Sequence, residues 1–373
     1  MKNINDWPAL DKEKLFSYLS WNSCLSERYK LFYVATPKVA CTSLKWWFAD
    51  MEGHAKELRE ITDSAETDPD LIIHDSLRKV APNITGLLPD ALLKPLTSDE
   101  YFRFAVVRNP YKRIFSAWQS KLLLREPIQI APYINCDFYN QPIKNADDIA
   151  AAFEGFLEHL AASEAPTFLD VHWTPQIDLL RPDLINYSKL VKIENAKELS
   201  TALSEWLGSE FVDPFANRSA NESLIPYLPK LITARSGELI RLLYARDFVT
   251  FGYSEEIPSA KEIFPSEQFK LAIKAIEIIR ARHQRMGDMR SMFTKQAKVV
   301  DEHAKIIDEQ GKVIDEQAKI IDEQAKVVDE QAKVVDEQAK LIDGVYVSRS
   351  WRLTRPIRFF EQSVHNLKSL LMH

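Results

Sequence analysis

The segment that most restricts the fold is residues 31–51, LFYVATPKVACTSLKWWFADM, in which a strand, a loop and a helix follow one another directly. Its apolar start predicts a buried strand, Thr36 and Pro37 predict a turn, and residues 42–51 predict a helix. From residue 31 to about residue 253, apolar runs of this kind keep alternating with helical stretches. This alternation predicts an α/β fold with a largely parallel sheet.

The loop between this strand and this helix predicts an anion site. A helix N-terminus presents N–H groups without partners and the positive end of the helix dipole. Lys38 adds a positive charge, and the hydroxyls of Thr42 and Ser43 lie where the helix starts. Both glycines of a Walker A loop are missing. The alternative interpretation is an N-capped helix that binds no ligand.

A second strand–helix junction lies at residues 102–118, FRFAVVRNPYKRIFSAW. Its apolar first part predicts a strand that ends at Arg108, with Asn109 as the N-cap and Pro110 as the first residue of the next helix. An arginine at a strand end can bind a phosphate with two N–H groups. Ser116, within the first two turns of that helix, can contact the same anion. A surface pair between Arg108 and a carboxylate is the alternative.

Two anion sites on consecutive strand ends suit a nucleotide that carries phosphates at both ends of its ribose. ATP differs, because its phosphates form a single chain. Arg113 lies in the same predicted helix. We expect it to be an exposed surface residue rather than a third ligand of the anion.

The two motifs together resemble the sulfotransferase superfamily, and PKVACTSLK is most similar to carbohydrate sulfotransferases of the HNK-1 and chondroitin type. Two later segments add to the resemblance. VHWTPQIDLL, residues 171–180, is similar to the HWxPQ segment of that group, and LIRLLYARDFVTFGY, residues 239–253, is similar to its YxxDFxxFGY segment. The resemblance spans residues 29–254 and implies a P-loop-NTPase-like core with a parallel sheet.

The resemblance implies 3'-phosphoadenosine 5'-phosphosulfate (PAPS) as the donor, a carbohydrate hydroxyl as the acceptor, and no metal. The residues that would hold the 5'-phosphosulfate are those of the first loop and helix start: Lys38, Val39, Ala40, Cys41, Thr42 and Ser43. Arg108 and Ser116 would hold the 3'-phosphate, and the NRSANES segment around Arg218 would cover the adenosine. Lys38 would also act in catalysis, by stabilising the negative charge on the leaving phosphate oxygen.

Transfer to a hydroxyl also requires a base that accepts the hydroxyl proton. His74, in LIIHDSL, follows an apolar run that we predict to be a strand, and related glycan sulfotransferases have a catalytic histidine in this interval. His172, beside Trp173, is the second candidate. For both histidines the alternative is a packing or surface role. Asp75 could orient a base, and we expect Glu194 to be structural.

Residues 294–342 contain seven successive seven-residue units, most of them close copies of DEQAKVV. One apolar line recurs at alternating spacings of three and four, the a/d pattern of a coiled coil: Ala304, Ile307, Gly311, Ile314, Ala318 and Ile321. The first line would form the contact surface between helices, called the seam below. A second apolar line lies beside it and widens this surface: Ile306, Val313, Ile320 and Val327. We predict a left-handed coiled coil over residues 294–343 that joins copies of the chain. A single solvated helix with Glu–Lys pairs is the alternative.

Charge is unevenly distributed along the chain. The net charge is −6, of which residues 301–343 contribute −7 and residues 344–373 contribute +4. Residues 1–300 contain no basic domain of the kind that binds nucleic acid. Four arginines recur every three residues among apolar and aromatic side chains in the last segment: Arg349, Arg352, Arg355 and Arg358. Such a segment can lie on an anionic membrane or dock on a partner; folding back on the end of the coil is the alternative.

These features divide the chain into an N-terminal lead (1–28), a sulfotransferase domain (29–293), a coiled coil (294–343) and a basic aromatic tail (344–373). The three cysteines, Cys24, Cys41 and Cys136, are too scattered for a disulfide framework or a zinc site. The N-terminus lacks the apolar region of a signal peptide, and no run approaches the ~20 apolar residues of a membrane-spanning helix.

We therefore expect a bacterial cytoplasmic enzyme, peripheral at the inner membrane face, that sulfates a surface polysaccharide or glycolipid. The tail sequence SRSWRLTRPIR resembles short tails of bacterial surface-polysaccharide enzymes. One alternative is a P-loop-type kinase, against which the absence of GxxxxGK[ST] counts. The other is a non-catalytic scaffold in which a degenerate sulfotransferase body presents the coil.

Overall fold

The structure is a computed structural model of the 373-residue chain. It describes residues 7–62, 64, 66–127, 131–162, 170–216, 223–261 and 263–371. The chain divides into two compact units, Met1–Ser291 and Met292–His373. The first unit contains the sheet and both anion-site motifs, and the second contains the heptad repeat and the basic tail.

A four-stranded sheet with the order β1-β2-β3-β4 forms the centre of the first unit. Its strands are β1 (Ser23–Ser26), β2 (Leu31–Val34), β3 (Phe102–Val107) and β4 (Lys189–Lys192). Strands β2, β3 and β4 are parallel, and β1 pairs antiparallel with β2. The predicted α/β fold with a largely parallel sheet is confirmed as a small mixed sheet.

Both faces of this sheet are buried, which explains the continuous apolar runs of β2 and β3. Tyr33 and Phe104 point to one face, where their rings stack with centroids 5.1 Å apart. Phe32, Val34 and Ala105 point to the other face. Neighbouring residues of one strand therefore serve two separate cores.

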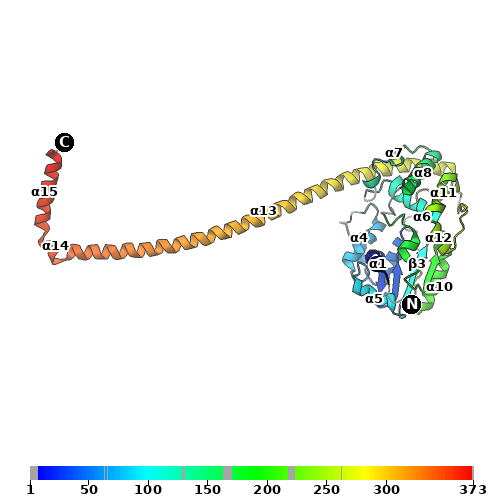
Figure 1. Cartoon of the computed structure of the whole chain (residues 1–373), viewed down its shortest axis with the longest axis horizontal. Helices are drawn as coiled ribbons and strands as arrows, with labels where there is room; N and C mark the ends of the chain where they lie inside the picture. Colours follow the sequence, from blue (N-terminus) through cyan, green and yellow to red (C-terminus); the bar gives the residue numbers. More distant parts are fainter. Residues whose placement is uncertain are drawn as a thin grey trace. The chain divides into compact units, whose positions relative to one another are not determined.

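Three groups of helices cover the sheet and its end (Figure 1). The helices on the face of Tyr33 are α2 (Cys41–Met51), α3 (Ala55–Arg59), α4 (Ile73–Val80) and α10 (Ala196–Leu207). Those on the face of Phe32 are α1 (Ala9–Asn22), α5 (Pro89–Thr97) and α9 (Gln176–Leu180). A third core joins α6 (Pro110–Trp118), the π-helix η3 (Gln119–Leu123), α7 (Asp137–Asn140), α8 (Ala146–Ala162), α11 (Ala234–Leu243) and α12 (Ala245–Phe251).

Short 3-10 turns connect several of these elements. They are η2 (Pro69–Ile72), η4 (Ala131–Tyr133), η5 (Ile193–Asn195), η6 (Gly208–Glu210) and η7 (Pro229–Leu231). Turn η5 follows β4 directly and leads into α10, so β4, like β2 and β3, ends near the start of a helix. This arrangement gathers loops and helix N-termini at the carboxyl edge of the parallel strands, where α/β proteins bind their ligands.

Residues 7–28 are part of the folded body and do not form the separate lead that was expected over residues 1–28. Helix α1 buries Leu15, Phe16 and Leu19 against the sheet, and β1 extends the sheet next to β2. The sequence of β1, SCLS, is too short and too polar to show a strand pattern, yet all four of its residues are buried. Pairing with β2, rather than its own composition, makes it a strand.

The run before His74 is helical, so the strand predicted there is wrong. Turn η2 leads directly into α4, and the side chain of Asp68 caps the turn by accepting a hydrogen bond from the N–H of Asp70. Ile73, Ser76 and Leu77 are buried at helical spacing. The apolar run was too short to distinguish a strand from a helix.

Helix α13 (Ser266–Val347) begins within the predicted sulfotransferase domain of residues 29–293 and continues through the repeat. Its first turns are anchored in the third core by Phe269, Ala272 and Ile276. Helical structure over the repeat is confirmed. In the single chain the seam is uncovered, with Ile307 and Ile321 exposed by 68% and 65%. Association through this seam therefore stays a prediction.

The basic tail is also helical, as α14 (Arg349–Leu353) and α15 (Arg355–Leu371). Ser348 caps α14, and the guanidinium of Arg358 lies 3.4 Å from the ring centre of Trp351, which joins the two helices. Among the described helices, none combines the length and apolarity that a bilayer span requires.

Candidate functional site

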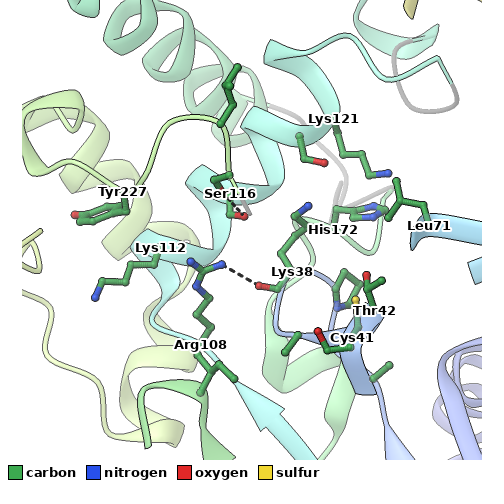
Figure 2. A pocket seen from close by; sticks show the side chains of 18 of the residues that line it. Lys38, Cys41, Thr42, Leu71, Arg108, Lys112, Ser116, Lys121, His172 and Tyr227 are labelled. Atoms are coloured by element: carbon green, nitrogen blue, oxygen red, sulfur yellow. Dashed lines mark hydrogen bonds between the residues drawn. The ribbon is translucent and has the colours of Figure 1, made fainter. Parts of the chain in front are cut away.

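A pocket of about 1110 Å³ lies at the carboxyl ends of β2, β3 and β4, and both predicted anion sites open into it (Figure 2). Arg108 Nη1 donates a hydrogen bond to the backbone oxygen of Lys38 at 3.1 Å, which brings the two motifs into contact. The predicted residues that line the pocket are Lys38, Ala40, Cys41, Thr42, Ser43, His74, Arg108, Ser116 and His172. The side chain of Val39, in the same loop, is buried in the core on the face of Tyr33. Arg218 lies outside the described residues.

The loop after β2 forms a turn of the phosphate-binding kind without glycine. Lys38 and Ala40 have φ angles of 65° and 52°, in the left-handed region that non-glycine residues avoid. Each costs about 1–2 kcal/mol, so the surroundings must hold the loop in place. The N–H of Val39 donates to the oxygen of Thr36, and Arg108 holds Lys38. Two further contacts come from side chains outside the loop: the hydroxyl of Tyr18 donates to the oxygen of Ala35 at 2.7 Å, and Arg113 donates to that of Pro37.

Arg113 supplies one of these contacts and is not the exposed residue that was predicted. It is 1% exposed, and its guanidinium donates to three backbone oxygens, those of Pro37 at 3.1 Å, Thr174 at 2.8 Å and Val171 at 3.1 Å. It thereby joins the first loop to the HWTPQ segment. Helix α6 is buried along nearly its whole length, which carries Arg113 inward.

Helix α2 presents its N-terminus to the pocket. Ala40 is the N-cap residue and makes no side-chain hydrogen bond to the first turn. Cys41 and Ser43 of that turn line the pocket, at the positive end of the helix dipole. Lys45, one turn later, is 4% exposed and lines the same wall. Within the described part of the chain, no carboxylate pairs with it. A buried lysine without a counter-charge indicates a place for an anion.

Lys38 is the central cation of the pocket. Burial, together with the nearby charges of Lys121 and Arg108, lowers the pKa of its amine to about 8. Figure 2 shows the side chain of Lys38 extending from the loop towards His172, with Lys121 on the other side of that histidine. Lys121 and Glu66, two further lining residues, were not identified from the sequence; burial raises the pKa of the Glu66 carboxyl to about 7.

The peptide of Arg108 is fixed by the two later motifs. Its N–H donates to Gln176 Oε1 and its oxygen accepts from Gln176 Nε2, both at 2.9 Å. The buried carboxylate of Asp247 in turn accepts from the backbone N–H groups of Gln176 and Ile177, each at 2.9 Å. The glutamine of HWTPQ and the aspartate of ARDFVTFGY therefore act in the structure by positioning the arginine.

Glu194 has the structural role that was expected. It accepts hydrogen bonds from the N–H of Asn109 and from the hydroxyl of Tyr253, at 3.2 and 2.9 Å. Asn109 itself caps α6 by accepting from the N–H of Tyr111, as predicted. Glu194 thus holds the start of α6 beside Arg108.

Ser116 faces the pocket from the second turn of α6, and its Oγ lies 3.3 Å from the Oγ of Ser223. Lys112, one turn before Ser116, and the ring of Tyr227 line the same end (Figure 2). The amide of Gln119 forms two 2.8 Å hydrogen bonds with the backbone of Ile225, which holds the wall of residues 223–227 against α6. This end of the pocket combines cations, hydroxyls and a flat aromatic ring.

His74 belongs to the loop end of the pocket. Its Nε2 lies 2.9 Å from Thr42 Oγ1. Burial holds the pKa of His74 well below its usual value, and the charges of Lys45 and Lys121 act in the same direction. Asp75 does not orient it in the structure, because its carboxylate accepts from the hydroxyls of Ser64 and Ser76.

His172 forms a pair with Asp170. Its Nδ1 lies 2.5 Å from Asp170 Oδ1, which also accepts from the backbone N–H of His172. Burial lowers the pKa of His172 to about 4 against the opposing effect of Asp170, so the ring is neutral at neutral pH. A carboxylate that holds the proton on Nδ1 leaves Nε2 as an acceptor, which is the arrangement of a general base and its orienting group. Asp170 was not identified from the sequence.

Comparison with known proteins agrees with this geometry. The profile of the sulfotransferase family matches residues 21–254. Carbohydrate sulfotransferase 10 of Xenopus laevis is 24% identical over 249 residues, which cover 62% of this chain and 67% of that protein. The corresponding values for carbohydrate sulfotransferase 10 of Homo sapiens are 26%, 250 residues, 61% and 66%.

Carbohydrate sulfotransferase 12 of Xenopus laevis is also similar, with 26% identity over 262 residues that cover 61% of this chain and 59% of that protein. The chain therefore spans about two thirds or less of the length of the curated relatives it matches. No solved structure matches the chain.

Proposed function

Because this chain belongs to the sulfotransferase family, we propose that it transfers a sulfuryl group from PAPS to a hydroxyl of a carbohydrate. The observation that carries this proposal is the single pocket that joins Lys38 and the start of α2 to Arg108 and Ser116. The names of the similar carbohydrate sulfotransferases support the acceptor class. Family membership is consistent with a P-loop-like core around the loop after β2.

The residues of the pocket fit the two charged ends of PAPS. Lys38, Lys45 and the N-terminus of α2 would neutralise the 5'-phosphosulfate, and Arg108 with Ser116 would bind the 3'-phosphate. Pockets for small ligands commonly measure about 300–1,000 Å³. A volume of about 1110 Å³ therefore leaves room for part of an acceptor beside the nucleotide.

When bound, PAPS supplies an activated sulfuryl group and a bisphosphate leaving group. Lys38 and the start of α2 stabilise the negative charge that develops on the leaving phosphate oxygen. His172 accepts the acceptor proton at Nε2 while Asp170 holds its Nδ1 proton. A bound polyanion offsets the charges of Lys38 and Lys121, so it raises the pKa of His172 towards the useful range.

We propose His172 rather than His74 as the base. His74 already shares its Nε2 with Thr42, and no carboxylate among the described residues orients it. In this interpretation His74 steadies the hydroxyl of Thr42 for its contact with the 5' end of the donor.

The donor assignment predicts a selective thermal stabilisation. Adenosine 3',5'-bisphosphate at about 100 times its dissociation constant should stabilise the protein by about 2.7 kcal/mol. For the first unit, Met1–Ser291, an unfolding entropy of about 2.1 cal/mol/K per residue makes this a rise in Tm of roughly 4–5 °C. ATP at the same concentration should leave Tm nearly unchanged, because it has no 3'-phosphate for Arg108. Equal stabilisation by ATP would favour a kinase. If the stabilisation is selective for the bisphosphate, a screen for transfer of labelled sulfuryl to glycans identifies the acceptor.

We further propose that the chain is a homo-oligomer through residues 294–343 and attaches peripherally to the inner face of a membrane through residues 344–373, within the cytoplasm. The uncovered seam of α13 supports the first proposal. The second is supported by an exposed apolar line on α14 and α15 at spacings of four and three: Leu353, Ile357, Phe360, Val364 and Leu367. Arg349, Arg352 and Arg355 supply charge for an anionic surface.

Removing residues 294–373 tests both proposals at once. We expect the truncated chain to form particles with fewer chains each, as given by the mass from light scattering divided by the mass of one chain, and to stop co-sedimenting with vesicles that contain anionic lipid. Stabilisation by adenosine 3',5'-bisphosphate should persist, because Phe269, Ala272 and Ile276 still anchor α13. An unchanged number of chains per particle would show that the seam does not join chains.

A further inference from the structure

The π-helix η3 (Gln119–Leu123) extends α6 and carries Lys121 into the pocket. Two hydrogen bonds from i+5 to i close this turn: the N–H of Leu124 donates to the oxygen of Gln119, and the N–H of Glu126 donates to the oxygen of Lys121, both at 3.0 Å. A π-turn shifts the side chains that follow it away from the regular face of an α-helix. Such turns occur frequently at functional sites.

Other elements hold this turn in place. Gln119 is bound to the backbone of Ile225. Arg280 Nε donates to the oxygen of Leu123 at 2.6 Å, and His283 Nδ1 lies 2.7 Å from the oxygen of Leu124. The last backbone oxygens of the turn are thereby satisfied by side chains from the start of α13. Lys121 consequently has a fixed position.

The ammonium group of Lys121 is buried but only partly paired. Lys121 is 9% exposed, and its Nζ lies 3.4 Å from Oε2 of Glu126, which is 3% exposed. An ammonium group has three N–H donors. Glu126 accepts at most one of them at this long distance, and within the described residues no other acceptor is in range. Lys121 therefore has donors available on the side of the pocket.

Lys121 and Lys38 are two like charges in one buried space. Figure 2 shows them on either side of His172. After burial, the charge of Lys121 lowers the pKa of Lys38 more than that of Arg108 does, although Arg108 is hydrogen-bonded to the Lys38 backbone. Like charges held together in a medium of low dielectric repel strongly. An anion between them would remove this repulsion.

We propose that Lys121 contacts a non-bridging oxygen of the transferred sulfuryl group and holds it in line between His172 and the leaving phosphate. This inference rests on the proposed function. In the step, the bond from the acceptor oxygen to sulfur forms while the bond from sulfur to the 5'-phosphate oxygen breaks. That oxygen keeps the electron pair, and the acceptor proton moves to His172. Lys121 neither gives nor takes a proton.

Two nucleotides separate this role from a structural one, because PAPS has the sulfuryl group and adenosine 3',5'-bisphosphate lacks it. The test protein is the double variant Lys121→Gln/Glu126→Gln, which leaves neither charge buried alone. By calorimetry, its affinity for PAPS should fall about 10- to 100-fold, the value of a charge-assisted hydrogen bond. Its affinity for adenosine 3',5'-bisphosphate should not fall, because repulsion on Lys38 is relieved.

Lys112→Gln is the matched control, since it removes the same charge from the same helix at the 3'-phosphate end. It should weaken both nucleotides by the same factor. Equal losses for both nucleotides in the double variant, or no loss for PAPS, would overturn the role of Lys121. If the wild-type protein binds neither nucleotide, the proposed function itself is wrong and this inference falls with it.

Discussion

Replacing Lys38 with alanine should lower the turnover number about 10²–10³-fold, the usual effect of removing one group that stabilises transition-state charge. The affinity for adenosine 3',5'-bisphosphate should fall only about tenfold, since the start of α2 and Lys45 still hold the 5'-phosphate. The difference arises because charge on the leaving oxygen grows in the transition state. Transfer of labelled sulfuryl measures the first quantity, and calorimetry measures the second.

The pH dependence gives this prediction a matched control. The amine of Lys38 has a pKa of about 8 in the free protein, so it is charged below that pH and neutral above it. The wild-type kcat/KM for PAPS should therefore fall as pH rises through 8. In Lys38→Arg the guanidinium stays charged above pH 12, so this fall should disappear. If Lys38→Ala turns over at the wild-type rate, Lys38 has no part in the mechanism.

Replacing Arg108 with alanine should weaken the affinity for adenosine 3',5'-bisphosphate about 100-fold, within the range for a buried charge pair. Turnover at saturating PAPS should change far less, because in this account Arg108 binds the 3'-phosphate and does not contact the transferred sulfuryl group. Lys38 keeps its position through the contact of Arg113 with Pro37. Calorimetry with the wild type and the variant measures the loss.

Adenosine 5'-phosphate supplies the control for Arg108, because it lacks the 3'-phosphate. Arg108→Ala should bind this nucleotide about as well as the wild type does. Arg108→Lys should recover only part of the lost affinity, since lysine cannot form the two-pronged contact of a guanidinium. Undiminished affinity for the bisphosphate in Arg108→Ala would refute the phosphate role.

Local signals were sufficient for the elements that place the two motifs. All residues of β2 and β3 are buried, and all are apolar or aromatic except Arg103. Asn109 and Pro110 mark the start of α6. Strand β4 has the polar sequence KLVK and β1 the sequence SCLS, and neither shows a strand period. Both are strands because each pairs with a neighbouring strand, β1 with β2 and β4 with β3. This pairing cannot be predicted from the local sequence.

The parts of the site that the sequence did not reveal depend on contacts between distant segments. Arg113 is buried because three oxygens from two other loops converge on it. Asp170 lies two residues from His172, but only the folded turn brings the carboxylate to the ring. Lys45 and Lys121 are ordinary helix lysines in sequence, and their burial at the pocket depends on how α2 and η3 pack.

The left-handed backbone conformation of two residues in the first loop also could not be predicted from the local sequence. A glycine at either position would have indicated a phosphate loop directly. Lys38 and Ala40 adopt the conformation because Arg108 and Arg113 hold the loop from the next strand and helix. The chemistry of the loop could be predicted from its lysine and hydroxyls, whereas its shape depends on contacts with distant residues such as Arg113.

A structure of the protein bound to adenosine 3',5'-bisphosphate is the most direct measurement of the central claim. We predict one nucleotide in the pocket, with its 5'-phosphate at Lys38 and the start of α2 and its 3'-phosphate at Arg108 and Ser116. A nucleotide that leaves either group of residues without a phosphate, or that binds outside the pocket, would contradict the account.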